Sequence, residues 1–429
     1  MKRICTLLAL SAPLCVWSET LTPVWVETGP DGQAIARVVV DQAADCPALV
    51  IDSDIDGASR TMTVRSPVPD GLKPACELAL PASARRVIAK TSHGNQTVPL
   101  PRPDPARVIV LGDTGCRIKG ARVQDCNDPA QWPFAQVAAG AAASKPDLVI
   151  HVGDYLYRED PCPAGKQKEC AGTPAGDNWN AWNADFFTPA AKLLAAAPWA
   201  FARGNHEDCK RSWRGWFYYL DPRPWPTHST TPGCLTYSPP YLVRLGKFEL
   251  FMLDSAAVNE SVAEPAQVSE FAAQLASLAP SNAWLVDHHP FWGFKTDENG
   301  GQAAPAPISA PLSAAWNRTF PGAAPRGITM ILSGHVHLFE LLNFDTRPPQ
   351  LVAGDGGTML AGALPQSLNG ITVEGGAMVS GQSRHEFGYT VLERSGPERP
   401  GAKWKLSLTN AQGHTLAGCS IEKGRAACK

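Results

Sequence analysis

The 429-residue sequence has few charged side chains and no block of either sign. Lys, Arg, Asp and Glu make up 18 % of the chain, and the formal net charge is −2. Clustered positive charge is what holds nucleic acids and anionic membrane surfaces, so neither is expected as a partner. Beyond the first residues, no apolar run approaches the roughly 20 residues of a membrane span, so no stable membrane insertion is expected.

Histidine is scarce and the spacing CxxC is absent. With only ten histidines in the chain, any grouping of them carries information. Without a CxxC pair, a zinc–thiolate site is disfavoured. No internal repeat is present, which argues against a solenoid or propeller.

The first 18 residues have the pattern of a secretory signal peptide. Lys2 and Arg3 precede an apolar stretch, Ile4 to Trp17, that is too short to span a bilayer. A lipoprotein anchor at Cys15 is disfavoured because the bulky Leu14 precedes it. A secreted or periplasmic location is therefore expected for the remaining chain.

Cysteine usage fits export. Ten of the twelve cysteines follow the signal, and an even number in an exported chain predicts disulfide bonds. They fall into five pairs that are adjacent in the sequence, although spacing alone does not determine connectivity. The pairs are 46–76, 116–126, 162–170, 209–234 and 419–428.

The pattern of apolar residues divides the mature chain in two. Residues 19–104 contain short β-rich runs between Gly, Pro and Asp turns, which predicts a small all-β domain. The proline-marked segment "PLPRPDPAR" at 99–107 closes it, and residues 105–429 form the second predicted domain.

Apolar strands and helices alternate in the second part. This alternation predicts a buried α/β sheet, in which ligands gather at the carboxyl ends of the strands. A β-hairpin is predicted at 241–255 around Gly246. The predicted strands are 106–113, 147–154, 198–207, 282–290, 327–337 and 349–357, and the predicted helices are about 130–144, 179–197 and 264–278.

Polar side chains follow five of these strands. Together they supply carboxylate, amide, phenol and imidazole groups, the mixture found in two-metal hydrolytic sites. One such strand end is weak evidence, whereas five in order are strong evidence. The candidates are Asp113, Asp154 with Tyr157, Asn205 with His206, His288 with His289, and His335 with His337.

These segments resemble the calcineurin-like metallophosphoesterases, and within them the purple acid phosphatases. That pattern, GDxG, GDxxY, GNH(D/E), VxxH and GHxH, is similar to five segments of this chain. They are "GDTG" (112–115), "GDYLY" (153–157), "GNHE" (204–207), "VDHHP" (286–290) and "GHVH" (334–337). The resemblance implies a four-layer α/β/β/α sandwich preceded by the small β domain.

The resemblance also implies a role for each residue. Asp113, Tyr157 and His337 would bind a first metal ion, and Asp154 would bridge two ions. Asn205, His288 and His335 would bind the second ion. His206 would contact the phosphate and protonate the leaving group, and Arg203 is a further candidate for phosphate binding, with a structural salt bridge as its alternative.

Two assignments have competing interpretations. A phenol loses its proton only near pH 10, so ligation by Tyr157 favours Fe(III) at the first site, with Zn, Mn or Fe(II) at the second. The alternative is that Tyr157 merely packs nearby. Spacing from Val286 selects His289, whereas spacing to Pro290 selects His288, which is preferred as the ligand.

The expected function is hydrolysis of small phosphate monoesters by metal-bound hydroxide. Two alternatives remain: a phosphodiesterase or nucleotidase that uses the same metals, and a non-catalytic protein that binds metal or phosphate. The natural substrate and the oligomeric state do not follow from the sequence.

Overall fold

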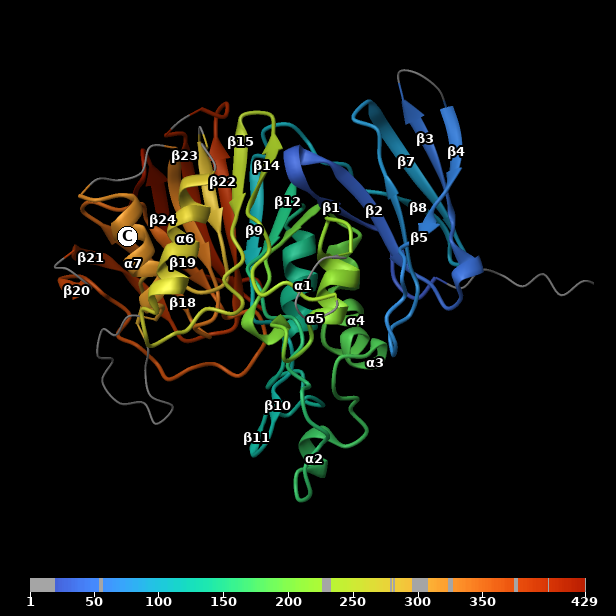
Figure 1. Ribbon diagram of the computed structural model, residues 1–429, viewed down its shortest axis with the longest axis horizontal. Coiled ribbons are helices and arrows are strands. Elements are labelled where there is room, and N and C mark those ends of the chain that lie inside the picture. Colours follow the sequence, from blue (N-terminus) through green and yellow to red (C-terminus); the bar gives the residue numbers. More distant parts are fainter. Residues whose placement is uncertain are drawn as a thin grey trace, which may run out of the picture.

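The computed structural model describes residues 20–53, 57–225, 233–277, 280, 282–294, 308–322, 327–373, 377–399 and 401–428. The predicted signal peptide lies outside the described residues. Two large β-sheets form the centre of the molecule, with the amino-terminal strands at one side and the carboxyl-terminal strands at the other (Figure 1).

The first sheet has eleven strands in the order β25-β24-β23-β22-β9-β12-β13-β1-β2-β6-β5. Its strands β9, β12, β13 and β1 are parallel, and the other pairs are antiparallel. The bounds are β1 Trp25–Thr28, β2 Ala34–Val39, β5 Thr63–Val64, β6 Ala75–Ala79, β9 Arg107–Leu111, β12 Leu148–His151, β13 Trp199–Phe201, β22 Gly388–Ser395, β23 Lys403–Asn410, β24 Thr415–Glu422 and β25 Arg425–Cys428.

The second sheet has eight strands in the order β14-β15-β16-β17-β19-β18-β21-β20. Its parallel centre is β15, β16, β17 and β19. The bounds are β14 Tyr241–Leu245, β15 Phe248–Met252, β16 Ala283–Val286, β17 Ile328–Ser333, β18 Phe339–Phe344, β19 Gln350–Ala353, β20 Ile371–Val373 and β21 Ala377–Arg384. Strands β14 and β15 form the predicted hairpin, with Gly246 at φ +68° in its turn.

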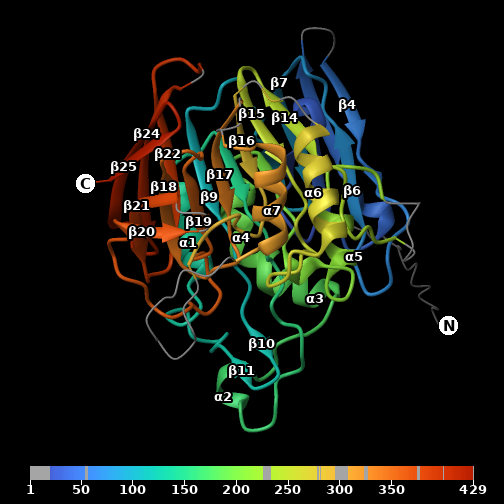
Figure 2. The same cartoon turned by 60° about the vertical axis from the view of Figure 1, so that its left-hand side comes forward.

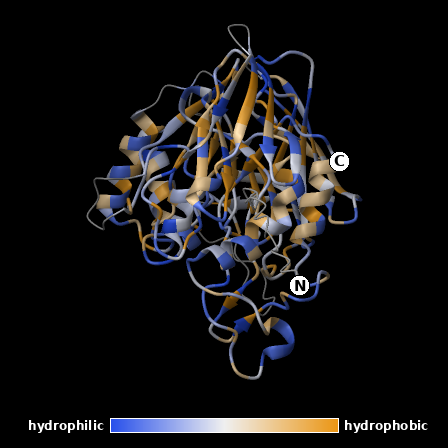
Figure 3. Ribbon diagram, turned by 90° about the vertical axis from the view of Figure 1, so that its right-hand side faces the viewer, coloured by the Kyte–Doolittle hydropathy of each residue, from blue (hydrophilic) through white to orange (hydrophobic). Residues whose placement is uncertain are grey.

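The two sheets pack face to face because alternate strand residues point to opposite sides. On β9, Val108 and Val110 join the core between the sheets, whereas Ile109 and Leu111 face the helices. The central strands are accordingly the most hydrophobic part of the ribbon (Figure 3).

Helices cover both outer faces. Helices α1 (Phe134–Ala143), α3 (Trp179–Trp182), α4 (Thr188–Leu194) and α5 (Trp213–Gly215) lie on the first sheet, with the π-helical turns η3 (Asn183–Phe187) and η5 (Trp216–Leu220). Helices α6 (Pro265–Ser277) and α7 (Ala310–Thr319) cover the second sheet. The layers therefore run helix, sheet, sheet, helix, as predicted.

The amino-terminal region is all-β apart from two short 3-10 turns, η1 (Pro30–Gly32) and η2 (Ala43–Asp45). Strands β3 (Ala48–Ser53), β4 (Gly57–Thr61), β7 (Ala84–Thr91) and β8 (Gly94–Thr97) form a separate sheet with its own core. However, β1 pairs in parallel with β13, so part of this region extends the large sheet. The domain boundary at residue 104 remains a prediction.

A small projection leaves the main body near the carboxyl ends of the central strands. It consists of the hairpin β10 (Ile118–Lys119) and β11 (Arg122–Val123) and the short helix α2 (Gln167–Cys170) (Figure 2). All five expected disulfide pairs are formed, and two of them, Cys116–Cys126 and Cys162–Cys170, hold this projection. Within the described residues, no helix combines the length and apolarity needed to cross a bilayer.

Candidate metal centre

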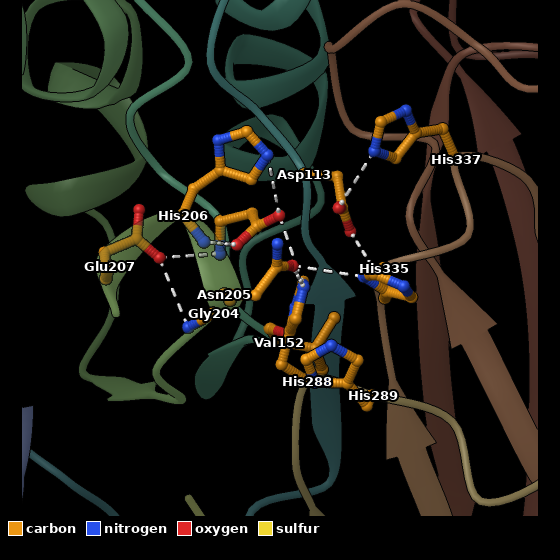
Figure 4. Close-up of polar contacts among 12 residues, drawn as sticks. Asp113, Val152, Gly204, Asn205, His206, Glu207, His288, His289, His335 and His337 are labelled. Carbon is orange, nitrogen blue, oxygen red and sulfur yellow. Dashed lines mark hydrogen bonds and ion pairs between the residues drawn. The ribbon is translucent and has the colours of Figure 1, made fainter. Parts of the chain in front are cut away.

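The predicted site residues all follow strands of the two sheets. Asp113 follows β9, Asp154 follows β12, and Asn205 begins η4 (Asn205–Glu207) after β13. Their counterparts from the second sheet, His288 and His335, follow β16 and β17. Because the parallel strands of each sheet end at the same edge, these side chains meet across the two sheets (Figure 4).

Three of these residues have an unusual backbone. Asp113, Asp154 and His335 adopt φ values of +54°, +62° and +69°. Non-glycine residues rarely adopt positive φ, and such conformations concentrate at functional sites where the surroundings enforce them. The sharp turns redirect each side chain from the end of its strand into the site.

One group of side chains surrounds the Tyr157 hydroxyl. It lies 2.9 Å from Asp113 Oδ1, 2.7 Å from Asp154 Oδ2 and 3.0 Å from His337 Nε2. All four residues were predicted for the first metal. The alternative, in which Tyr157 only packs nearby, does not fit a hydroxyl held among three polar groups.

A second group surrounds the Asn205 amide. Its Oδ1 lies 2.9 Å from His288 Nε2 and 3.1 Å from His335 Nδ1. His288 Nε2 is also 3.2 Å from Asp154 Oδ2, the same oxygen that contacts Tyr157. Asp154 thus stands between the two groups, where a bridging carboxylate is required.

The histidines present lone pairs to these groups. His288 Nδ1 faces the carbonyl of Val152 at 2.8 Å, and His337 Nδ1 faces the carbonyl of Met359 at 2.8 Å. In neutral rings those nitrogens carry the proton, so each Nε2 turns a lone pair inward. Metal-binding histidines are characteristically backed in this way.

His335 is backed by a carboxylate instead of a carbonyl. Its Nε2 lies 3.4 Å from Glu260 Oε1, which leaves Nδ1 facing the Asn205 oxygen. Turned over, the amide would donate to His288, His335 and Asp154 and accept from Arg211. The orientation with oxygen inward sets lone pairs against one another, an arrangement that a cation between them would stabilise. The donor set therefore fits a pair of metal ions.

Burial perturbs the titration of these groups. Burial raises the pKa of Tyr157 well above its usual value, and the neighbouring Asp113 and Asp154 raise it further. Burial also raises the pKa of Asp113 to about 8. Burial lowers the pKa of His288, but the Asp154 carboxylate outweighs it and brings the pKa to about 10. Without cations the phenol keeps its proton, so ligation by Tyr157 demands a strongly polarising ion.

Glu207 fixes the two site loops to each other. Its carboxylate accepts hydrogen bonds from the N–H groups of Asp154, Tyr155, Leu156 and Gly204 at 2.9–3.2 Å. Gly204 is obligatory there, because a Cβ would lie 2.0 Å from Asp154 Oδ1. Glu207 therefore orders the backbone of the loops and makes none of its four hydrogen bonds to His206.

The residue that contacts His206 is Glu159, which the sequence analysis missed. Glu159 Oε1 lies 2.5 Å from His206 Nδ1, and His206 Nε2 lies 3.8 Å from Asp154 Oδ2. The sequence offers one signal: Glu159 comes two residues after Tyr157, so an extended chain directs both side chains to the same face.

The contacts of Arg203 correspond to the structural alternative. Its fully buried guanidinium lies 3.1 Å from Asp254 Oδ2 and donates to the carbonyls of Glu207 and Leu235. These bonds direct it away from the metal ligands, so the geometry does not support phosphate binding by Arg203. A buried ion pair with these carbonyl partners is instead a structural tie.

His289 is buried behind the ligands. Its Nδ1 lies 3.4 Å from Ser255 Oγ, and its ring packs 4.2 Å from that of His335. Glu260, His289 and His335 offer a group of potential ligand atoms, as do Asp113, Asp154 and His288. Of the two adjacent histidines, only His288 contacts both Asn205 and Asp154 in the described contacts.

A cavity of about 680 Å³ opens onto these groups. Its wall includes predicted ligands and, from the projecting hairpin and the loop after η4, several basic residues that the sequence analysis did not single out. The lining consists of Arg117, Lys119, Ala121, Arg122, Asp154, Asn205, His206, Arg211, Glu260, His335 and His337.

The model of the calcineurin-like phosphoesterase family matches residues 106–339, from β9 to the start of β18. The chain belongs to the calcineurin-like phosphoesterase family. This phosphoesterase is thus a metal-dependent enzyme of phosphate-ester chemistry, and the family implies the dinuclear centre whose candidate ligands are described above. No protein of curated function matches the chain.

Two solved structures share the fold of this phosphoesterase. Purple acid phosphatase PPD1 from yellow lupin (Lupinus luteus) seeds has a TM-score of 0.60 and 13 % identity, over 95 % of this chain and 75 % of the lupin chain. PhoD has a TM-score of 0.59 and 11 % identity, over 97 % of this chain and 93 % of its own. At these identities the likeness concerns the fold, which is purple acid phosphatase-like.

Proposed function

We propose that this phosphoesterase hydrolyses phosphate monoesters at a dinuclear metal centre, with His206 as the general acid. The observation that carries the proposal is the position of Asp154 Oδ2, 2.7 Å from the Tyr157 hydroxyl and 3.2 Å from His288 Nε2. One carboxylate oxygen shared by two groups of ligands is what a pair of close, mutually repelling cations requires.

The ligands divide as the sequence analysis assigned them. Asp113, Tyr157 and His337 would hold the first ion, Asn205, His288 and His335 the second, and Asp154 both. When bound, the cations would lower the pKa of water and neutralise charge on the phosphoryl oxygens. The phenol of Tyr157 supports Fe(III) at the first position, with Zn, Mn or Fe(II) at the second.

His206 would protonate the leaving oxygen. Its ring lines the cavity with five of its atoms' neighbours already fixed: the backbone N–H donates to Asp154 Oδ1 at 2.9 Å, and the carbonyl accepts from Ser212 Oγ at 2.6 Å. Glu159 at Nδ1 stabilises the imidazolium, so that Nε2 can carry the proton toward the cavity. A leaving group that departs as an alcohol needs this proton, which favours monoesters of poor leaving groups.

Export supports the same function. Five disulfide bonds are typical of a protein that matures outside the cytoplasm, which agrees with the proposed signal peptide and a secreted or periplasmic location.

The test uses purified mature protein, metal analysis and three esters: an aryl monoester, an alkyl monoester and a bis-aryl diester. We expect about two metal ions per chain and faster turnover of monoesters than of the diester. Asp154→Asn should lose metal and activity, whereas Asp70→Asn, on an exposed turn, should retain both. Faster diester turnover would indicate a phosphodiesterase, and a metal-loaded protein inert toward all three would indicate a binding protein.

A further inference from the structure

Arg117 is an unpaired cation in the wall of the metal cavity. Its guanidinium carbon lies 5.1 Å from the centroid of the Tyr157 ring, and the residue lines the cavity with Asp154 and His206. Within the part of the chain that the structure describes, Nε of Arg117 is buried without a hydrogen-bond partner, and no carboxylate pairs with the guanidinium. A cationic donor removed from water without an acceptor is costly unless a ligand supplies one.

Neighbouring cations in the same cavity already have partners. Lys119 Nζ lies 2.8 Å from Glu159 Oε2, and Arg211 lies 3.6 Å from Glu159 Oε1. Glu159 thus neutralises part of the charge of these two residues and leaves Arg117 as a positive group that is free to take an anion.

The backbone of Arg117 is held firmly. Its N–H donates to Gln124 Oε1 at 3.1 Å, and its carbonyl accepts from the Gln124 N–H at 2.8 Å. The same Gln124 oxygen accepts from the N–H of Met359, whose carbonyl backs His337. On the other side, Cys116 is bonded to Cys126, and its N–H donates to the buried Asp185 at 3.0 Å.

This arrangement separates a fixed backbone from an unpaired side chain. Such preorganisation keeps the entropic cost of capturing a ligand low. The guanidinium fork matches the spacing of two oxygens on one phosphoryl group, which an ammonium does not.

We propose that Arg117 binds the non-bridging oxygens of the substrate phosphoryl group and so positions it over the metal centre. The inference rests on the proposed function, since it assigns a substrate contact to the same cavity. Arg117 replaces Arg203 as the arginine that contacts phosphate, and it would also balance the negative charge that develops on those oxygens.

The test compares Arg117→Met, Arg117→Lys and Arg60→Met in the metal-loaded, full-length mature protein. Arg60 is exposed on strand β4 of the amino-terminal sheet and serves as the matched control. Titration calorimetry with inorganic phosphate measures affinity, elemental analysis measures bound metal, and initial rates on an aryl monoester give KM and kcat.

Arg117→Met should weaken phosphate binding about 10- to 100-fold, the effect of losing charge-assisted hydrogen bonds, and should raise KM. Arg117→Lys should fall between wild type and Arg117→Met, because it keeps the charge and loses the fork. Metal content and thermal stability should not change, since the lost guanidinium has no partner in the protein. Arg60→Met should behave as wild type.

Two results would overturn the inference. One is phosphate affinity of Arg117→Met within about twofold of wild type. The other is loss of metal from Arg117→Met, which would make Arg117 a support for Tyr157 instead of a phosphate ligand. If the wild type binds metal and phosphate but hydrolyses no ester, the proposed function fails, and the calorimetric comparison still decides the role of Arg117.

Discussion

Oε1 of Glu159 lies 2.5 Å from Nδ1 of His206, at the edge of the cavity and opposite the nitrogen that faces Asp154. This contact joins a residue of the family motif to one outside every motif. Interactions with His206 lower the pKa of Glu159 to about 2, against the opposing effect of burial. Glu159 therefore acts as a carboxylate that orients the ring and stabilises its charged form.

Replacing Glu159 should impair hydrolysis in proportion to the need for a proton on the leaving group. Glu159→Gln should lower kcat about 10-fold or more for an alkyl phosphate. It should have a much smaller effect for an aryl phosphate whose leaving group departs as an anion. Rates over a series of leaving groups measure the difference, with the exposed Glu264→Gln as control. Equal losses for all esters would contradict the positioning role.

The two tyrosines of the "GDYLY" segment should behave differently. Tyr157→Phe removes the hydroxyl among the first-metal ligands and should lower metal content by about one ion per chain. In the iron-loaded protein it should also remove the visible absorption band. The Tyr155 hydroxyl donates instead to the Ala202 carbonyl at 2.7 Å. Tyr155→Phe should keep metal and colour and lose about 1 kcal/mol of stability. An active wild-type protein that is colourless and free of iron would contradict the assignment of Fe(III).

The adjacent histidines provide a second matched pair. His288→Ala should lose the second metal because Nε2 is placed between Asn205 and Asp154. His289→Ala should retain both ions, since Nδ1 of His289 faces Ser255 and burial lowers its pKa well below the usual value. Metal stoichiometry of the two purified variants measures this difference. Loss of the second metal from His289→Ala alone would reverse the assignment.

Glu340 should make stability depend on pH. It is fully buried on β18, and burial raises the pKa of its carboxyl from 4.5 to about 8. Because the folded state holds the proton more tightly than the unfolded state, the contribution is fully present below pH 4.5 and is lost as the pH rises to about 8.

Glu340→Gln, which cannot ionise, should therefore be more stable than wild type at pH 8.5 by about 2 kcal/mol, with the difference shrinking toward pH 5. Urea unfolding at several pH values measures it. The exposed Glu264→Gln should show no such trend. A constant difference between Glu340→Gln and wild type at all pH values would contradict the prediction.

The local sequence was sufficient to predict the strands and much of the candidate centre. Apolar runs ending in Asp113, Asp154 or Asn205 predict buried parallel strands with polar ends, because burial on both faces demands continuous hydrophobicity and parallel strands end at one edge. Cysteines close in sequence also pair in the structure, since short loops bring them together. In these cases the relevant distances are short along the chain.

Only the tertiary structure decided which atoms meet across the sheets. The direction of Arg203 toward Asp254, the choice of His288 over His289, the approach of Glu159 to His206 and the unpaired guanidinium of Arg117 all depend on backbone segments far apart in sequence. The same holds for the pairing of β1 with β13, which joins the amino-terminal strands to the large sheet. Periodicity tells which face a side chain occupies, whereas its partner is set by the packing of distant elements.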